Sequence, residues 1–147
     1  LKPEFQDYIK TVLANAKILS ETLKNNGFKI YSGGTDTHLM LVDLRPFNVK
    51  GNLASESLSR ANITCNKNGI PFDTESPMVT SGIRLGSQAA TTRGFGLKEF
   101  EEVGNLITKT IKGLSMNPND NSKVEEEVRN EVVSLCSSFP IYKNLYK

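Results

Sequence analysis

The feature that most constrains the fold of this chain is an almost unbroken apolar run, HLMLVDL, from His38 to Leu44. A short apolar run of this kind is typical of a strand that is covered on both faces. A shorter strand is predicted at residues 28–31, and the turn SGGTD at residues 32–36 separates the two strands. The run therefore predicts a strand pair that other elements of the fold must bury.

Apolar residues at helical spacing lie on either side of this strand pair. Between Pro3 and Asn26 they recur every three or four positions, which predicts a long amphipathic helix in front of the strands. Asn52 is expected to cap a second helix, which ends near Ala61 and leads into a further strand at residues 63–66. The alternation of helix and strand predicts the α/β class, as an α+β two-layer sandwich.

Two more helices are predicted in the last third of the chain. Apolar residues from Phe100 to Leu114 keep helical spacing after Gly96. Ser122 and Glu125 then have the spacing of a capping box, which predicts the start of a final helix that ends before Pro140.

The length of 147 residues fits one domain with a sizeable core. Within it we expect a leading helix at residues 1–27, a sheet-and-helix core at residues 28–117 and a carboxyl-terminal helical tail at residues 118–147. The chain starts at Leu1 with no pattern of a targeting signal, which fits a fragment of a longer protein.

Composition excludes several classes of protein. The net charge of +2 comes from scattered residues, so neither a nucleic acid nor a membrane is expected as a partner. The two cysteines, Cys65 and Cys136, are far apart and suit a reducing cytoplasm rather than a disulfide framework. With His38 as the one histidine, no metal site is expected.

The stretch TSGIRLGSQAATTRGF sets two arginines among three glycines. If residues 78–85 form a strand, Arg84 lies on the face opposite Ile83, between Gly82 and Gly86. Its guanidinium group could grip a carboxylate or phosphate with two parallel hydrogen bonds, and the glycines would leave room for that anion. An ion pair with an internal Asp or Glu is the alternative role.

Other candidate residues have equally good structural explanations. Arg93 follows three small residues and is expected to cap a helix or form an ion pair. Asn68 and Gly69 form a common turn dipeptide within a breaker-rich loop at residues 67–77. His38 begins an apolar strand and is interpreted as structural. The glycines match neither a phosphate loop nor a dinucleotide fingerprint, and no catalytic residue is expected in this chain.

Three segments together resemble the carboxyl-terminal domain of serine hydroxymethyltransferase. They are SGGTDTHLMLVDL, ITCNKNGIPFDTESPMVTSGIRLGSQAATTRGF and EVVSLCSSFPIY. The most specific part runs from Asn66 to Phe95, where NKN, IP, SP, TSGIR and TTRGF stand in the order and spacing of the family. The resemblance implies the small domain of a fold-type I pyridoxal-phosphate enzyme.

The resemblance also implies roles for individual residues. Enzymes of this family use pyridoxal 5'-phosphate to interconvert serine and tetrahydrofolate with glycine and 5,10-methylenetetrahydrofolate. Arg84 would hold the carboxylate of the amino acid, and Arg93 would have a supporting role. His38 and Asp43 match family positions and are interpreted as structural. The folate would contact Asn68, Ser76, Pro77 and Met78.

The large domain of the family is absent from this sequence. The resemblance places the Schiff-base lysine in that domain, within a Thr-rich segment ending in His-Lys, and Lys67 is not that lysine. The fragment is therefore expected neither to bind the cofactor stably nor to turn over. The full-length enzyme is expected to be a cytoplasmic homodimer that binds serine, glycine and folate.

Two alternative functions remain at this point. A small α/β RNA-binding module would use Arg84, Arg93 and the lysines, but it needs exposed aromatic residues, and Phe5, Phe28 and Phe100 fall on apolar stripes. Another fold-type I pyridoxal enzyme, such as an aminotransferase, would share the carboxylate-binding arginine, but the NKN segment argues against it.

Overall fold

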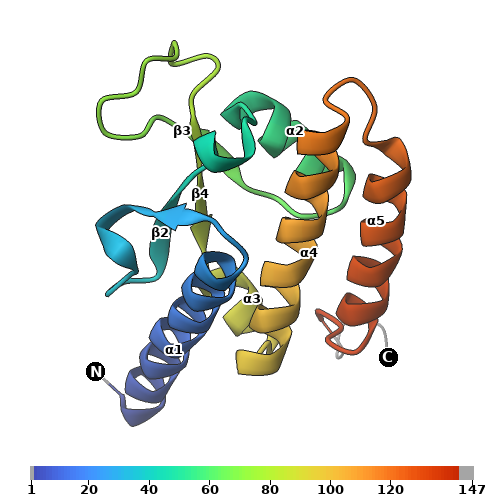
Figure 1. Ribbon diagram of the computed structural model, residues 1–147. Helices are drawn as coiled ribbons and strands as arrows, with labels where there is room; N and C mark the ends of the chain where they lie inside the picture. The colour runs from blue at the N-terminus through green and yellow to red at the C-terminus, as the bar shows by residue number, and fades with distance from the viewer. Residues whose placement is uncertain (1, 143–147) are drawn as a thin grey trace.

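The computed structural model describes residues 2–142, in which helices lie against a small sheet (Figure 1). The outer ends of the expected leading helix and helical tail, residue 1 and residues 143–147, fall outside the described residues. In chain order the elements are α1 (Pro3–Asn25), β1 (Lys29–Ile30), η1 (Tyr31–Gly33), β2 (Leu39–Asp43), η2 (Arg45–Phe47), α2 (Gly51–Arg60), β3 (Asn66–Asn68), β4 (Gly82–Gly86), α3 (Gln88–Arg93), α4 (Leu97–Met116) and α5 (Ser122–Ser137).

The sheet has four strands in the order β1-β2-β4-β3, and every neighbouring pair is antiparallel. The longest strands, β2 and β4, pair in the middle, with Met40 opposite Leu85 and Val42 opposite Ile83. These four side chains are buried and face the helices. The predicted α+β two-layer sandwich is therefore confirmed.

The expectation that the apolar run is covered on both faces is wrong. Along β2, Met40 and Val42 are buried, whereas Leu39 and Leu41 are only half-buried. Side chains alternate between the two faces of a strand, and within the described residues the helices pack on one face only. The second face of the sheet, which carries Leu41 and Arg84, is left open at its centre.

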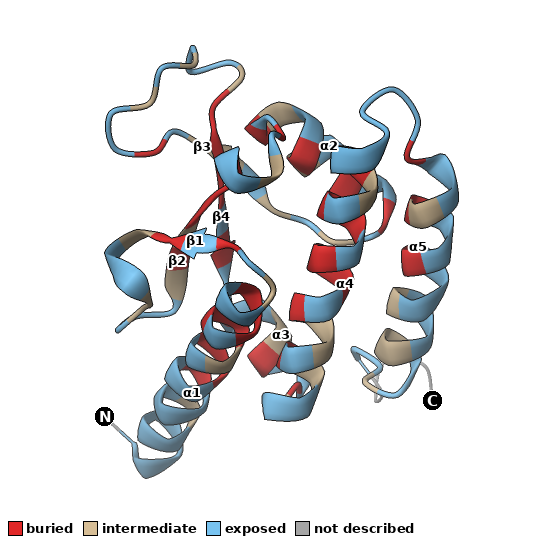
Figure 2. Cartoon of the chain, in the orientation of Figure 1, coloured by how far each residue is buried: buried red, intermediate tan, exposed pale blue. Residues whose placement is uncertain are grey.

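The helical layer buries the apolar stripes that the periodicity predicted. Helix α4 lies between α1, α2 and α5, and buried residues lie along the inward sides of these helices (Figures 1 and 2). The contributors to the core from α1, α2 and α4 include Ala16, Leu19, Leu23, Ala54, Leu58, Phe100, Ile107, Ile111 and Leu114.

Three strand and loop predictions are wrong in position. The third strand covers Asn66–Asn68 rather than residues 63–66, because the backbone of NKN pairs with β4. Strand β4 begins at Gly82 rather than at residue 78, since the preceding residues form a turn. The expected loop before Arg93 contains a short helix, α3.

Two predicted helix caps are also wrong. Helix α2 begins at Gly51, and the backbone N–H groups of Gly51 and Asn52 donate to the carbonyls of Thr80 and Val79 at 2.9 Å. The start of α2 is therefore satisfied by the loop before β4 and not by an Asn52 side chain.

At the start of α5, the side chain of Glu125 does not form a capping box. It is buried and joins α5 to α2, because its carboxylate accepts two hydrogen bonds from Arg60 and one from the hydroxyl of Ser57, each at 2.7 Å. The Arg60 guanidinium is the main cause that holds the pKa of Glu125 below its ordinary value, and burial opposes this effect.

We predict that Glu125→Gln lowers the free energy of unfolding at pH 7 by about 1–3 kcal/mol, because Arg60 and Ser57 lose a charged acceptor. A lowered pKa in the folded state stabilises the protein above the ordinary value of 4.5 and ceases to do so as the pH falls below it. The difference from wild type should therefore shrink in acid. Urea denaturation at several pH values measures it, with Glu126→Gln on the exposed side of α5 as the matched control. An equal effect of both variants would contradict the assignment.

Candidate functional site

Arg84 lies at the centre of the open face of the sheet. It is exposed and lies opposite both Leu41 on β2 and Asn66 on β3. Among residues 2–142 its side chain forms neither an ion pair nor a hydrogen bond. Within this part of the chain, the alternative role as partner of an internal carboxylate is not observed, and the guanidinium group is free to bind an anion.

The glycines beside Arg84 have a different role from the one expected. A Cβ atom at Gly82 would lie 2.7 Å from Cγ2 of Ile70, and one at Gly86 would lie 2.7 Å from Oε1 of Gln88. The glycines therefore let neighbouring groups approach the strand closely instead of leaving empty space for a ligand. The opening at Arg84 comes from the uncovered sheet face.

Asn68 is close to Arg84 because of strand pairing. Asn66 lies opposite Arg84 and Asn68 lies opposite Gly82, so both asparagines share the open face with the arginine. The side-chain Nδ2 of Asn68 donates to the carbonyl of Gly69 at 2.8 Å. Asn68 therefore ends a strand, and its amide group lies where β3 enters the loop that follows.

Asp73 organises the loop between β3 and β4. Its carboxylate accepts the backbone N–H groups of Ile70, Glu75 and Ser81 at 2.9–3.1 Å, and the Ser81 hydroxyl at 2.6 Å. Burial opposes ionisation, but these hydrogen bonds outweigh it and hold the pKa of Asp73 well below its ordinary value. The sequence interpretation missed this role, although an Asp between Pro and Ser in a breaker-rich loop is a signal for it.

A depression of about 330 Å³ lies over this loop. Its lining includes Asn68, Ser76 and Pro77, three of the four residues expected to contact a folate. Met78, the fourth, does not line it and is 73% exposed. Its full lining is Lys67, Asn68, Gly69, Asp73, Glu75, Ser76, Pro77 and Thr80.

Arg93 has a structural contact away from this depression. Its Nε donates to the carbonyl of Phe139 at 2.7 Å and its Nη2 to that of Cys136 at 3.1 Å. These carbonyls lie at the end of α5, where no following backbone N–H group of the helix is available to bond them. Of the two structural roles expected for Arg93, the structure shows the capping one.

Asp43 and His38 lie at opposite ends of β2. The buried Asp43 carboxylate accepts two side-chain hydrogen bonds from Nε and one from Nη2 of Arg45. Burial raises the pKa of Asp43, and the Arg45 contacts outweigh burial and lower it. The backbone carbonyl of His38 accepts the N–H of Ser87 at 3.0 Å.

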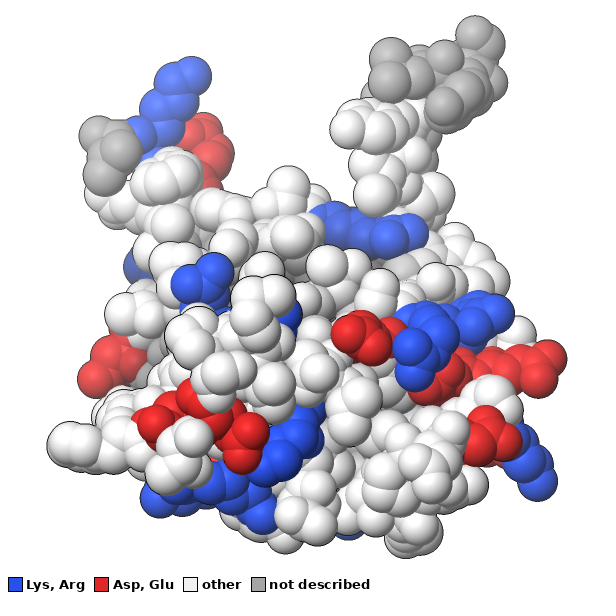
Figure 3. Space-filling view, turned by 90° about the horizontal axis from the view of Figure 1, so that it is seen from above, with Lys and Arg blue, Asp and Glu red and all other residues white. Residues whose placement is uncertain are grey.

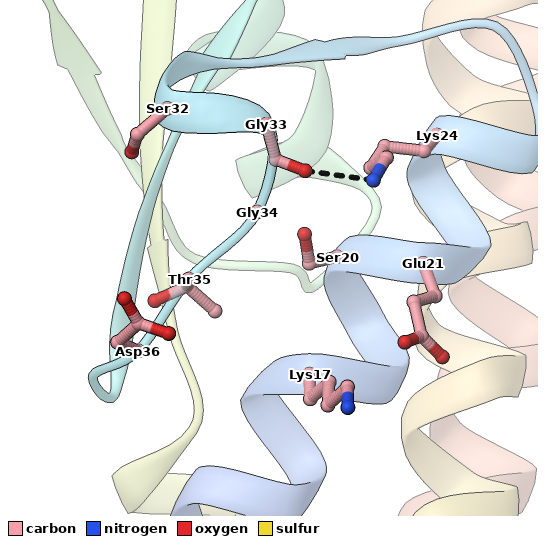
Figure 4. A pocket seen from close by; sticks show the side chains of 9 residues that line it. All are labelled: Lys17, Ser20, Glu21, Lys24, Ser32, Gly33, Gly34, Thr35 and Asp36. Carbon is pink, nitrogen blue, oxygen red and sulfur yellow. Dashed lines mark hydrogen bonds between the residues drawn. The ribbon is translucent and has the colours of Figure 1, made fainter.

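A second, polar depression of about 280 Å³ separates α1 from the turn at residues 32–36 (Figure 4). Lys24 Nζ spans it and donates to the carbonyl of Gly33 at 2.7 Å. The hydroxyl of Ser20 points toward this turn, and it is buried without a partner among the described residues. Lysines and carboxylates both line this depression, so its chemistry selects no ligand class.

On the face seen in Figure 3, basic and acidic side chains are mixed. Phe28 and Phe100 are buried, as the apolar stripes predicted, but Phe5 is 46% exposed. Among residues 2–142, no helix is long and apolar enough to span a membrane, and no cluster of three or more His, Cys, Asp or Glu residues could hold a metal ion.

Comparison with known proteins assigns this fold and arginine-bearing sheet to one family. The family model for serine hydroxymethyltransferase matches residues 1–107. Over 145 residues the chain is 84% identical to a serine hydroxymethyltransferase of Pelagibacter ubique (strain HTCC1062), which covers 99% of this chain. It is 62% identical over 143 residues, 97% of this chain, to one from Marinomonas sp. (strain MWYL1).

The chain belongs to the serine hydroxymethyltransferase family. It spans about a third of the length of these relatives, 33% of the Pelagibacter protein and 34% of the Marinomonas protein. The resemblance carried by NKN, TSGIR and TTRGF is therefore confirmed at the level of the family.

We predict that Asp73→Asn loosens the loop of the depression while leaving the sheet intact. An amide NH₂ would replace one carboxylate oxygen and face N–H donors, so the amides of Ile70, Glu75 and Ser81 should exchange about fivefold faster, as the loss of about 1 kcal/mol implies. Hydrogen exchange measures this change, with Asp36→Asn in the exposed turn before β2 as the control. Unchanged exchange at all three amides would show that Asp73 does not hold the loop.

Proposed function

We propose that the full-length protein interconverts serine and tetrahydrofolate with glycine and 5,10-methylenetetrahydrofolate. In this proposal the present chain supplies the arginine that holds the amino-acid carboxylate and part of the folate site. The observation that carries the proposal is the position of Arg84, which is exposed on the open sheet face beside Asn66 and has no ion pair among the described residues.

The proposed role of Arg84 is to orient the substrate. A guanidinium group presents two parallel N–H donors that match the two oxygens of a carboxylate, so the bound amino acid is fixed in direction as well as in place. The strand holds the backbone of Arg84 on both sides through pairing with β2 and β3. The pairing therefore fixes the point on the sheet from which the side chain reaches the substrate.

The proposed folate contacts are Asn68, Ser76 and Pro77, which share one depression, with Met78 next to it as an exposed apolar side chain. The amide of Asn68 can both donate and accept a hydrogen bond, as the edge of a pteridine ring requires. Asp73 holds the backbone of this loop in place, so its contribution to folate binding is one of position.

Pyridoxal 5'-phosphate does not fit the described residues of this chain. The open face presents a guanidinium group and amides, which suit a carboxylate but offer no lysine for a Schiff base. Lys67 lies opposite Ile83, so its strand position is on the other face from Arg84, although Lys67 also lines the depression over the loop. The proposal therefore assigns cofactor binding and the catalytic residues to the remainder of the full-length protein. It expects no turnover by this chain alone. It also proposes that the full-length enzyme is a cytoplasmic homodimer.

We predict that Arg84→Lys in the full-length protein raises the KM for serine about tenfold or more, because an ammonium group cannot reproduce a two-point contact. Steady-state kinetics with varied serine measures the effect. Arg129→Lys on α5, away from the sheet, is the matched control and should leave KM unchanged. An Arg84→Lys enzyme with the KM of wild type would contradict the role of Arg84.

Asn68→Ala should instead weaken tetrahydrofolate binding about fivefold, the loss expected for about 1 kcal/mol of hydrogen bonding. Serine affinity should change little, since Asn68 is two strand positions from the residue opposite Arg84. Titration of both ligands against the same variant tests the separation. An equal loss of serine affinity would show that Asn68 does not belong to a distinct folate site.

A further inference from the structure

The loop between β3 and β4 carries a fully exposed aromatic side chain. This loop projects from the body of the molecule (Figure 1). Phe72 lies on it and is 99% exposed, more than any other large apolar side chain among residues 2–142. Single exposed apolar residues are common on protein surfaces, so exposure alone assigns no role to Phe72.

The backbone at this position is also unfavourable for a phenylalanine. The N–H of Asp73 donates to the carbonyl of Ile70 at 3.0 Å and closes a turn. Pro71 and Phe72 are its two central residues, and Phe72 has a φ of 58°. A proline followed by a positive φ is the pattern of a type II turn, in which glycine or asparagine is favoured at the second central position because a bulky side chain crowds the backbone there. Neither the turn nor the core therefore explains the aromatic ring.

The turn holds Phe72 at the rim of the depression over this loop. Asp73, the next residue, lines the depression, and its carboxylate accepts the backbone N–H groups of Ile70 and Ser81 at 3.1 Å and 2.9 Å. The side chain of Ile70, at the other end of the turn, is buried. Both ends of the turn are therefore anchored, and the exposed ring is attached to a fixed backbone.

A tetrahydrofolate molecule bound in the depression would extend over its rim. The molecule joins a pteridine ring system to an aminobenzoyl ring and a glutamate. The depression measures about 330 Å³, at the lower end of the range of about 300–1,000 Å³ for pockets that hold drug-sized ligands. With the edge of the pteridine at Asn68, the aminobenzoyl ring is the part of the ligand that reaches the rim.

We propose that Phe72 contacts the aminobenzoyl ring of tetrahydrofolate and determines specificity for folates over shorter pterins. The inference rests on the proposed function and adds a contact to the proposed folate site. Aromatic rings attract each other in offset-stacked and edge-to-face arrangements, which corresponds to a gain in affinity of about fivefold. This gain explains a phenylalanine at a position where the turn favours glycine or asparagine.

A protein surface fits Phe72 less well. The next four residues of the loop, 73–76, are polar, so Phe72 does not belong to a continuous apolar patch. A stable interface between proteins buries at least about 1,000 Å² in total around an apolar centre. An isolated ring instead suits a ligand that offers one flat ring.

The experiment compares two ligands on the full-length protein by titration calorimetry. One is tetrahydrofolate, and the other is methyltetrahydropterin, which keeps the reduced pteridine but lacks the aminobenzoyl ring. Phe72→Asn should weaken tetrahydrofolate binding about fivefold and leave methyltetrahydropterin binding unchanged. Phe72→Gly replaces this variant if it does not fold. The thermal midpoint of Phe72→Asn should not fall, because asparagine accepts a positive φ more readily than phenylalanine.

Two matched variants serve as controls. Phe72→Tyr keeps the aromatic ring and should bind both ligands as the wild type does. Val133→Asn removes an apolar side chain that is 55% exposed on α5, and it should also leave both affinities unchanged.

Equal affinity of Phe72→Asn and wild type for tetrahydrofolate would overturn the proposal. An equal loss for both ligands would also overturn it, and a lower thermal midpoint would then identify the rest of the polypeptide as the partner of Phe72. Glycine formation from serine is measured on the same wild-type protein. An active wild type with an unaffected Phe72→Asn variant refutes the contact alone, whereas a wild type that neither binds tetrahydrofolate nor forms glycine refutes the proposed function.

Discussion

The antiparallel pairing of β2 with β4 is the constraint on which the rest of the structure depends. Val42 lies opposite Ile83, and both face the helical layer. Since side chains alternate along a strand, this register turns Arg84 to the other face. A slip by one residue would bury the guanidinium group in the core, where an unpaired charge is very costly. The burial of apolar side chains on one face thus determines the position of the arginine on the other.

The loop between β3 and β4 connects this sheet to the helices. Asp73 binds three of its backbone N–H groups, and the start of α2 donates to the carbonyls of Val79 and Thr80. Thr80 has a positive φ of 63° and is buried against Gly51. A Cβ atom at position 51 would collide with the hydroxyl of Thr80. The depression on this loop is therefore held in shape by Asp73 and Thr80, both of which also line it.

The sequence was sufficient to predict α1, α2, α4 and α5, though not the short α3, and the side of the sheet that Arg84 occupies, because these follow from the periodicity of apolar residues. It was insufficient where tertiary contacts replaced local signals. Glu125 has capping-box spacing, yet it pairs with Arg60, which is distant in sequence. NKN has the composition of a turn, but pairing with β4 makes it a strand. The proposed folate residues came from family resemblance, since no local pattern brings Asn68 and Ser76 together.

The most direct test of this account is the tetrahydrofolate-dependent conversion of serine to glycine by the full-length protein, measured beside the 147-residue chain. The account predicts that the full-length protein forms glycine only when tetrahydrofolate is present and that the shorter chain forms none. Absence of the reaction in the full-length protein would contradict the proposed function, and glycine formation by the shorter chain would contradict the assignment of cofactor binding to the remaining two-thirds.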